Sequence, residues 1–254
     1  MIFHHSIPLY NMATHTNAGG EAGKRRFHIG RENGEKTGRP VFLEWLRELP
    51  DEAARKGRQF ETRNGSNGPR HYERFSALDG VITEIRRERR VILDEEKTFL
   101  YVTFDDGSEV YDVEIGDFDG RYSLNLMARL CSPDFNPTLK SRISPYALEA
   151  DGKMYIGVSL YNGTDKIEAR REGDGFQPAK AETSEFKGKK LWDFMPVANW
   201  LFDYLQQNVV PNLSGDAWTA TPAPAATAMR PPSNATQVPF PTTEPAGAAD
   251  DLPF

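Results

Sequence analysis

Alternating residues at 153–161 have the chemistry to bind the bases of a nucleic acid. Successive side chains of a β-strand point to opposite faces, so the apolar residues at the even positions are predicted to face a core. Tyr155 and Tyr161 then share the other face, and Gly157 leaves room between them. Exposed rings stack on bases of any sequence, at about 1–3 kcal/mol per base. The alternative is a second core layer under a helix or loop.

The same alternation recurs at 98–104. Phe99 and Tyr101 fall on the face opposite Leu100, Val102 and Phe104. They are predicted to form a second pair of stacking rings.

Basic residues are interleaved with aromatic ones between positions 58 and 75. Cations neutralise phosphates while rings stack on bases. We therefore expect one single-stranded nucleic-acid groove formed by Arg58, Phe60, Arg63, Arg70, Tyr72, Arg74, Lys140 and Arg142, with Phe99, Tyr101, Tyr155 and Tyr161. The basic run at 86–90 is either a solvated strand extension or a further phosphate contact.

The 254 residues have a net charge of −6, but the charge is unevenly distributed. Residues 24–90 contain 17 basic and 11 acidic residues, whereas residues 91–120 contain one basic and 10 acidic residues. Electrostatic fields act over about 8–10 Å in physiological salt, so a basic groove can work on an acidic protein. Ordinary variation along a solvated surface is the alternative.

The acidic segment suggests a different class of protein, a magnesium-dependent nuclease. Its carboxylates are Asp105, Asp106, Asp112, Glu114, Asp117 and Asp119. Asp105 and Asp106 belong to an Asp-Gly turn, however, and Asp112 and Glu114 to the solvated face of a strand. We predict that the chain is not an enzyme and uses no metal or cofactor.

The C-terminal residues have the composition of a tethered docking peptide. Residues 214–247 are rich in Ala, Pro and Thr, as in a disordered linker. In the tip at 248–254, Pro253 stiffens the backbone and Phe254 suits an apolar pocket. The residues expected to bind partner proteins are Asp250, Asp251, Leu252, Pro253 and Phe254.

Local patterns predict a mainly β fold. Strands are expected at 70–93, with a bend at Gly80, at 98–104 and 109–115 around a turn, and at 153–161 and 165–170. Helices are expected at 122–131 and from 196 to about 209, and 41–49 is a short helix or strand. This order predicts a five-stranded OB-type antiparallel barrel with an inserted helix and a C-terminal packing helix. The barrel spans 41–213 and follows a flexible arm at 1–40.

Cysteine usage and hydropathy restrict the location. Cys131 is the single cysteine, so an internal disulfide is excluded, and a buried thiol is expected. No stretch approaches the roughly 20 apolar residues of a membrane span. We expect a cytoplasmic protein with no membrane partner.

The tip resembles the acidic C-terminal tip of bacterial and phage single-stranded DNA-binding proteins, although two aspartates are fewer than in many relatives. The stretches at 74–82, 143–146 and 157–161 are also similar to phage members of that family. The resemblance implies an OB fold that coats single-stranded DNA without sequence specificity during replication, recombination and repair, in the host cytoplasm if phage-encoded. It also implies that the tip recruits replication or recombination enzymes and competes with DNA. A recombination annealing protein, an adaptor that uses the tip alone, and a homo-oligomer stay open.

Overall fold

The computed structural model describes residues 24–213, apart from 36, 66–67, 174 and 188. The strands are β1 (Arg25–Arg31), β2 (Pro40–Leu46), β3 (Gln59–Gly65), β4 (Gly68–Phe75), β5 (Leu78–Ile92), β6 (Glu95–Asp105), β7 (Val110–Asp117), β8 (Ser141–Ala150), β9 (Lys153–Asn162), β10 (Asp165–Ile167), β11 (Glu182–Phe186) and β12 (Lys189–Asp193). The helices are α1 (Arg121–Leu130) and α2 (Met195–Asn208), with short 3-10 turns at Glu32–Gly34 and Val210–Asn212.

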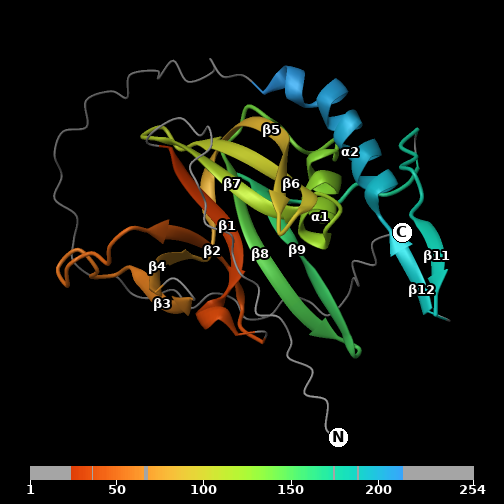
Figure 1. The fold of residues 1–254 in the computed structure, drawn as a ribbon. Helices are drawn as coiled ribbons and strands as arrows, with labels where there is room; N and C mark the ends of the chain where they lie inside the picture. The colour runs from red at the N-terminus through yellow and green to blue at the C-terminus, as the bar shows by residue number, and fades with distance from the viewer. Residues whose placement is uncertain (1–23, 36, 66–67, 174, 188, 214–254) are drawn as a thin grey trace, which may run out of the picture.

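Ten of these strands form one sheet in the order β10-β9-β8-β5-β6-β7-β1-β2-β4-β3, and β11 and β12 form a separate hairpin (Figure 1). The mainly β prediction is therefore confirmed. The predicted five-stranded antiparallel barrel is wrong, because the sheet has ten strands and stays open, with β10 and β3 at its two edges. It is also mixed, since β1 runs parallel to β7.

The first strand replaces the flexible arm that the sequence predicted for residues 24–40. β1 pairs with β2 on one side and with β7 on the other. Phe27 is buried, with its ring centroid 5.2 Å from Phe75 and 5.1 Å from Tyr111. The predicted domain boundary at residue 41 is therefore wrong. Residues 1–23 lie outside the described part of the chain.

Strand β5 pairs with two different strands on either side of Gly80, where the sequence predicted a bend. Its residues 78–80 pair with β8, and residues from Val81 onward pair with β6. A Cβ at position 80 would lie 2.9 Å from the Asp105 carbonyl oxygen, so glycine permits this close approach. The single strand predicted at 70–93 is wrong, because the chain breaks at residues 76–77 between β4 and β5.

Both helices lie where the sequence places them, and they close the core. α1 packs against β9 and α2. Phe118, directly after β7, lies 5.5 Å from Phe202 of α2 between ring centroids. Cys131 is buried, and burial raises its pKa to about 12, as expected for a core thiol. Among the described residues, neither helix has the length and apolar character needed to cross a membrane.

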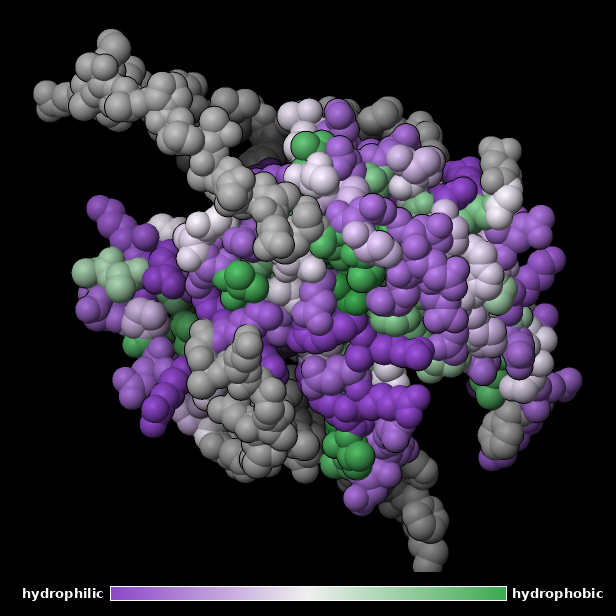
Figure 2. Space-filling view, turned by 90° about the horizontal axis from the view of Figure 1, so that it is seen from above, coloured by the Kyte–Doolittle hydropathy of each residue, from purple (hydrophilic) through white to green (hydrophobic). Residues whose placement is uncertain are grey.

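The peripheral hairpins project from this body. β3–β4 and β11–β12 lie on opposite sides, and β8–β9 extends past the end of the core (Figure 1). Seen from above, the surface is mostly hydrophilic, with apolar residues in small separate patches (Figure 2).

Candidate nucleic-acid interface

The outer face of the β8–β9 hairpin brings tyrosines and cations together. Tyr161 lies directly opposite Arg142, and Lys166 of β10 is the next neighbour across. Tyr155 and Tyr161 are both half-buried. Their separation of six residues corresponds to about 20 Å along the strand. Two of the predicted stacking rings, each partly exposed, therefore share one face with a predicted cation.

The inner face of β9 follows the predicted alternation only in part. Val158 and Leu160 are buried in the core. Met154 is 46% exposed, because this end of the hairpin extends past the core. The apolar row therefore anchors only the half of the hairpin that contains Tyr161.

A third tyrosine, Tyr146, lies between the two predicted ones. It faces Gly157 across the β8–β9 pair, and its hydroxyl accepts a 3.5 Å hydrogen bond from Asn125 Nδ2 of α1. A Cβ at position 157 would lie 2.6 Å from the Tyr146 hydroxyl and from Asn125 Oδ1. Tyr146 and Asn125 thus use the space that the sequence assigned to a base. Pro145 is tolerated in β8 because the edge of this strand that faces β2 forms no ladder hydrogen bonds. The sequence did not predict β8, because a proline is unusual within a strand.

Asn125 fixes the helix to the same hairpin. Its Oδ1 accepts hydrogen bonds from the backbone N–H of Val158 at 2.9 Å and from Arg129 Nε at 3.2 Å. Because Asn125 is itself buried, these bonds hold it against Tyr146. Asn125 therefore connects the tyrosine face to helix α1.

The predicted cations of β8 and of the segment before it are open to solvent. Arg142 is 59% exposed and donates to Asp79 at 2.7 and 3.2 Å. Lys140, in the segment before β8, is exposed. An exposed pair of this kind is worth about 0–1 kcal/mol, so a phosphate can compete for Arg142.

The predicted residues of β3 and β4 are divided between the two faces of the sheet. Arg63, Arg70, Tyr72 and Arg74 share one face, whereas Phe60 pairs with Glu73 on the other. Arg58 lies 5.1 Å above the Phe60 ring and donates a two-pronged hydrogen bond to Glu73. Arg58 and Phe60 are therefore not part of one groove with the rest.

Tyr72 is only 4% exposed, with the Arg63 guanidinium 5.1 Å from its ring centroid and His28 edge-on at 5.9 Å. The stacking role predicted for Tyr72 is wrong because its ring is covered. Trp45, opposite Tyr72 on β2, is 59% exposed and was not predicted.

A groove forms where β2 and β8 lie next to each other without forming a ladder in the described chain. Its cavity has a volume of about 260 Å³. It is lined by Glu32, Arg39, Pro40, Val41, Gln59, Arg74, Ser76, Ser144, Pro145, Tyr146 and Ala147. Two of these lining residues are joined, because the Ser144 hydroxyl donates a hydrogen bond to the Ser76 carbonyl at 2.7 Å. The groove thus connects Arg74 with the Tyr146 side of the hairpin.

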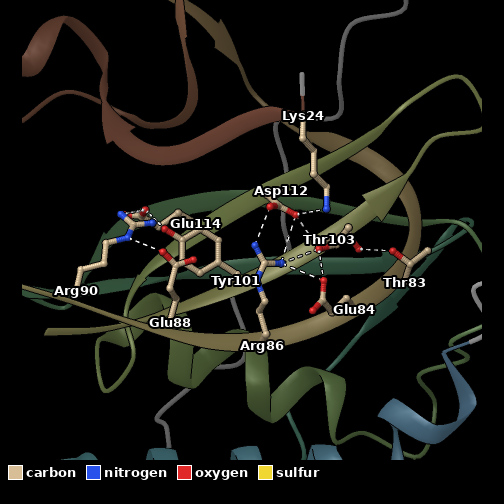
Figure 3. Close-up of polar contacts among 10 residues, drawn as sticks. All are labelled: Lys24, Thr83, Glu84, Arg86, Glu88, Arg90, Tyr101, Thr103, Asp112 and Glu114. Atoms are coloured by element: carbon tan, nitrogen blue, oxygen red, sulfur yellow. Dashed lines mark hydrogen bonds and ion pairs between the residues drawn. The ribbon is translucent and has the colours of Figure 1, made fainter. Parts of the chain in front are cut away.

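Phe99 and Tyr101 lie on a different outer surface, formed by β5, β6 and β7. Figure 3 shows Tyr101 on this surface. They are 7% and 1% exposed, and the Arg90 guanidinium lies 5.2 and 5.1 Å from their ring centroids. The Tyr101 hydroxyl donates to Glu114. The stacking role predicted for these two rings is wrong, because arginines from the neighbouring strand cover them.

The basic run at 86–90 is engaged within the protein. Arg86 Nη2 bonds Asp112 at 2.7 Å, and Arg90 Nη1 bonds Glu114 at 2.9 Å (Figure 3). On the other face, Arg87 donates to Asn199 of α2 at 2.9 Å and lies over the ring of Phe202. Arg89 pairs with Glu96 at 3.3 Å. The prediction of a solvated strand extension at 86–90 is therefore incomplete, because Arg86 and Arg90 cover part of the sheet.

The acidic cluster expected of a nuclease is dispersed. Asp106 accepts hydrogen bonds from the Ser108 hydroxyl and from the backbone N–H groups of Ser108 and Glu109, and these bonds lower its pKa. Asp112 is 2% exposed, so its predicted place on a solvated face is wrong. In the described ranges no three His, Cys, Asp or Glu side chains are grouped so as to hold a metal ion.

The predicted linker at 214–247 and tip at 248–254 fall outside the described residues. Comparisons with protein-family models, with curated proteins and with solved structures find no match.

Proposed function

We propose that this chain binds single-stranded DNA without sequence specificity, along the outer face of β8 and β9. Bases stack on Tyr155 and Tyr161, and phosphates meet Arg142 and Lys166. The proposal depends on one observation: half-buried rings and solvent-exposed cations occupy the same face of this hairpin. Stacking needs the flat side of a base, which only an unpaired strand can turn toward the protein.

We further propose that the segment from β5 to β9 is an OB-type unit whose barrel is left open. Its order of bent strand, hairpin, helix and second hairpin supports this reading. The insertion of β1 beside β7 accounts for the open sheet. Recruitment of replication or recombination enzymes by Asp250–Phe254 is proposed from the resemblance of that tip alone.

Fluorescence anisotropy of labelled oligo-dT with the full chain tests the function. The wild-type protein is expected to bind, and affinity should fall with salt without vanishing, since stacking persists where phosphate contacts are screened. The Tyr155→Ala/Tyr161→Ala double variant should lose about 30-fold or more, because each ring is worth at least about 1 kcal/mol. Trp192→Ala is the matched control, since Trp192 is 52% exposed on the separate β11–β12 hairpin.

Two results contradict the proposal. Affinity of the double variant equal to that of wild type defeats the stacking role. If the wild-type chain does not bind the DNA, the candidate that remains is an adaptor protein that uses its tip alone. Incubation of the complex with Mg²⁺ tests the nuclease alternative, because a nuclease would degrade the DNA.

A further inference from the structure

The groove between β2 and β8 differs from an ordinary phosphate site in its charge. Arg39 and Arg74 supply two positive charges, and Glu32 and Glu61 lie beside Arg74 with two negative ones. Glu61 is 8% exposed and is held by the backbone N–H of Asn33 at 2.9 Å and by Arg63. Two carboxylates therefore already lie beside the Arg74 guanidinium, which disfavours a phosphate at this position.

Arg74 nevertheless has unused hydrogen-bonding capacity. Its Nε is buried and has no hydrogen-bond partner in the described chain. Its Nη1 approaches Glu32 and Glu61 only to 3.8 Å in each case, beyond hydrogen-bond distance. An unsatisfied buried donor costs about 1–3 kcal/mol, so a ligand acceptor at this position would be favoured.

The size and walls of the groove suit one flat heterocycle. A volume of about 260 Å³ is below the roughly 300–1,000 Å³ of sites for drug-sized ligands. Pro40, Pro145 and Tyr146 supply apolar walls, and Gln59 supplies an amide. A base edge offers acceptors and N–H donors side by side, which match an arginine next to a carboxylate and an amide.

We propose that the groove holds one unstacked base of the bound strand, with its edge toward Arg74 and Glu32 and its ring against Tyr146. This inference rests on the proposed single-stranded DNA binding and adds a subsite to it. The contacts are made to an uncharged group, so they release no counterions and contribute a part of the affinity that does not depend on salt.

Two measurements test the subsite. In the first, the ¹H–¹⁵N resonance of Arg74 Nε is followed in the full chain while thymidine or inorganic phosphate is added. Thymidine should shift it and phosphate should not. A shift with phosphate alone, or with neither probe, overturns the proposal. Because thymidine is an uncharged monomer, this result stands even if the chain fails to bind oligo-dT, in which case only the proposed function fails.

In the second, oligo-dT affinity is measured over a range of salt concentrations. Arg74→Gln should lose about fivefold or more in affinity with an unchanged salt slope, because it removes a base contact. Gln59→Ala should act in the same direction, and this exposed side chain can be removed without opening an ion pair. Lys166→Met is the control, and its slope should fall by about 0.7, the value for one phosphate contact on a single strand. A comparable fall for Arg74→Gln would overturn the proposal.

Discussion

Two outer surfaces of the sheet contain the same residue types but differ in what their arginines bind. On β5–β7, Arg86 and Arg90 bond Asp112 and Glu114 across the strands, and Tyr101 beneath them is 1% exposed (Figure 3). On β8–β9, Arg142 is 59% exposed, and the neighbouring tyrosine rings are half-buried. The first surface is internally satisfied, whereas the second is open to a ligand.

The difference shows that interleaved arginines and aromatics do not by themselves indicate a nucleic-acid surface. Removing one partner of a buried ion pair costs about 3–5 kcal/mol, so Arg86 cannot leave Asp112 for a phosphate without a large loss. The exposed pair of Arg142 and Asp79 is worth about 0–1 kcal/mol and can exchange. The cross-strand partner of each cation therefore decides whether it is held within the fold or can exchange to a ligand.

The largest expected difference between the two surfaces is the effect of losing an arginine on the free energy of unfolding. Arg86→Met should lower the free energy of unfolding by about 3 kcal/mol, because it leaves the buried Asp112 with one cation fewer. Oligo-dT affinity of the folded protein should not change. Urea denaturation followed by tryptophan fluorescence measures the first quantity and anisotropy the second. Arg89→Met is the control, since the Arg89–Glu96 pair is 69% and 63% exposed and should contribute less than about 1 kcal/mol. Weakened DNA binding by folded Arg86→Met would remove the distinction between the surfaces.

The same buried carboxylate should make stability depend on acid pH. Burial raises the pKa of Asp112, but hydrogen bonds from Arg86, Lys24 and Thr103 lower it by more, from 3.8 to about 2. A pKa lower in the folded state than in the unfolded chain stabilises the fold above pH 4, and this contribution is lost as pH falls toward 2.

The contribution amounts to about 2 kcal/mol. The difference in unfolding free energy between wild type and Asp112→Asn should therefore shrink by that amount between about pH 5 and pH 2. Urea denaturation at several pH values measures it. A difference that stays constant with pH would show that Asp112 is not the titrating group.

Local signals in the sequence predicted the elements whose patterns are strong. The Asp-Gly turn defines the β6–β7 hairpin, and helical spacing defines α1 and α2. β1 was missed because only Phe27 among its seven residues is buried, so its pattern is that of a polar segment. The place of β1 in the sheet depends on its parallel pairing with β7, which joins segments more than 80 residues apart and leaves no local pattern.

The candidate site was predictable to the extent that strand alternation determines it. Alternation placed Tyr155 and Tyr161 together on β9, and the register of β8 adds Arg142. Alternation also predicted Phe99 and Tyr101 as stacking rings. It does not show that Arg86 and Arg90 cover them, because these arginines come from a different strand. Tyr146 was missed since Pro145 obscures β8, although the pattern Arg142, Ser144, Tyr146 is visible once that strand is known.

The smallest expected effect concerns Arg142 on the solvent-exposed surface of β8–β9. Arg142→Met should leave the unfolding free energy within about 1 kcal/mol of wild type, because its pair with Asp79 is exposed. The salt slope of oligo-dT binding should fall by about 0.7, since one phosphate contact is lost. Asp79→Asn should have the opposite effect and tighten binding slightly, because it removes the carboxylate that competes with phosphate for Arg142. These opposite signs cannot arise from damage to the fold, which would weaken binding in both variants. Equal salt slopes for all three proteins would place the phosphates elsewhere and leave β8–β9 with its tyrosines alone.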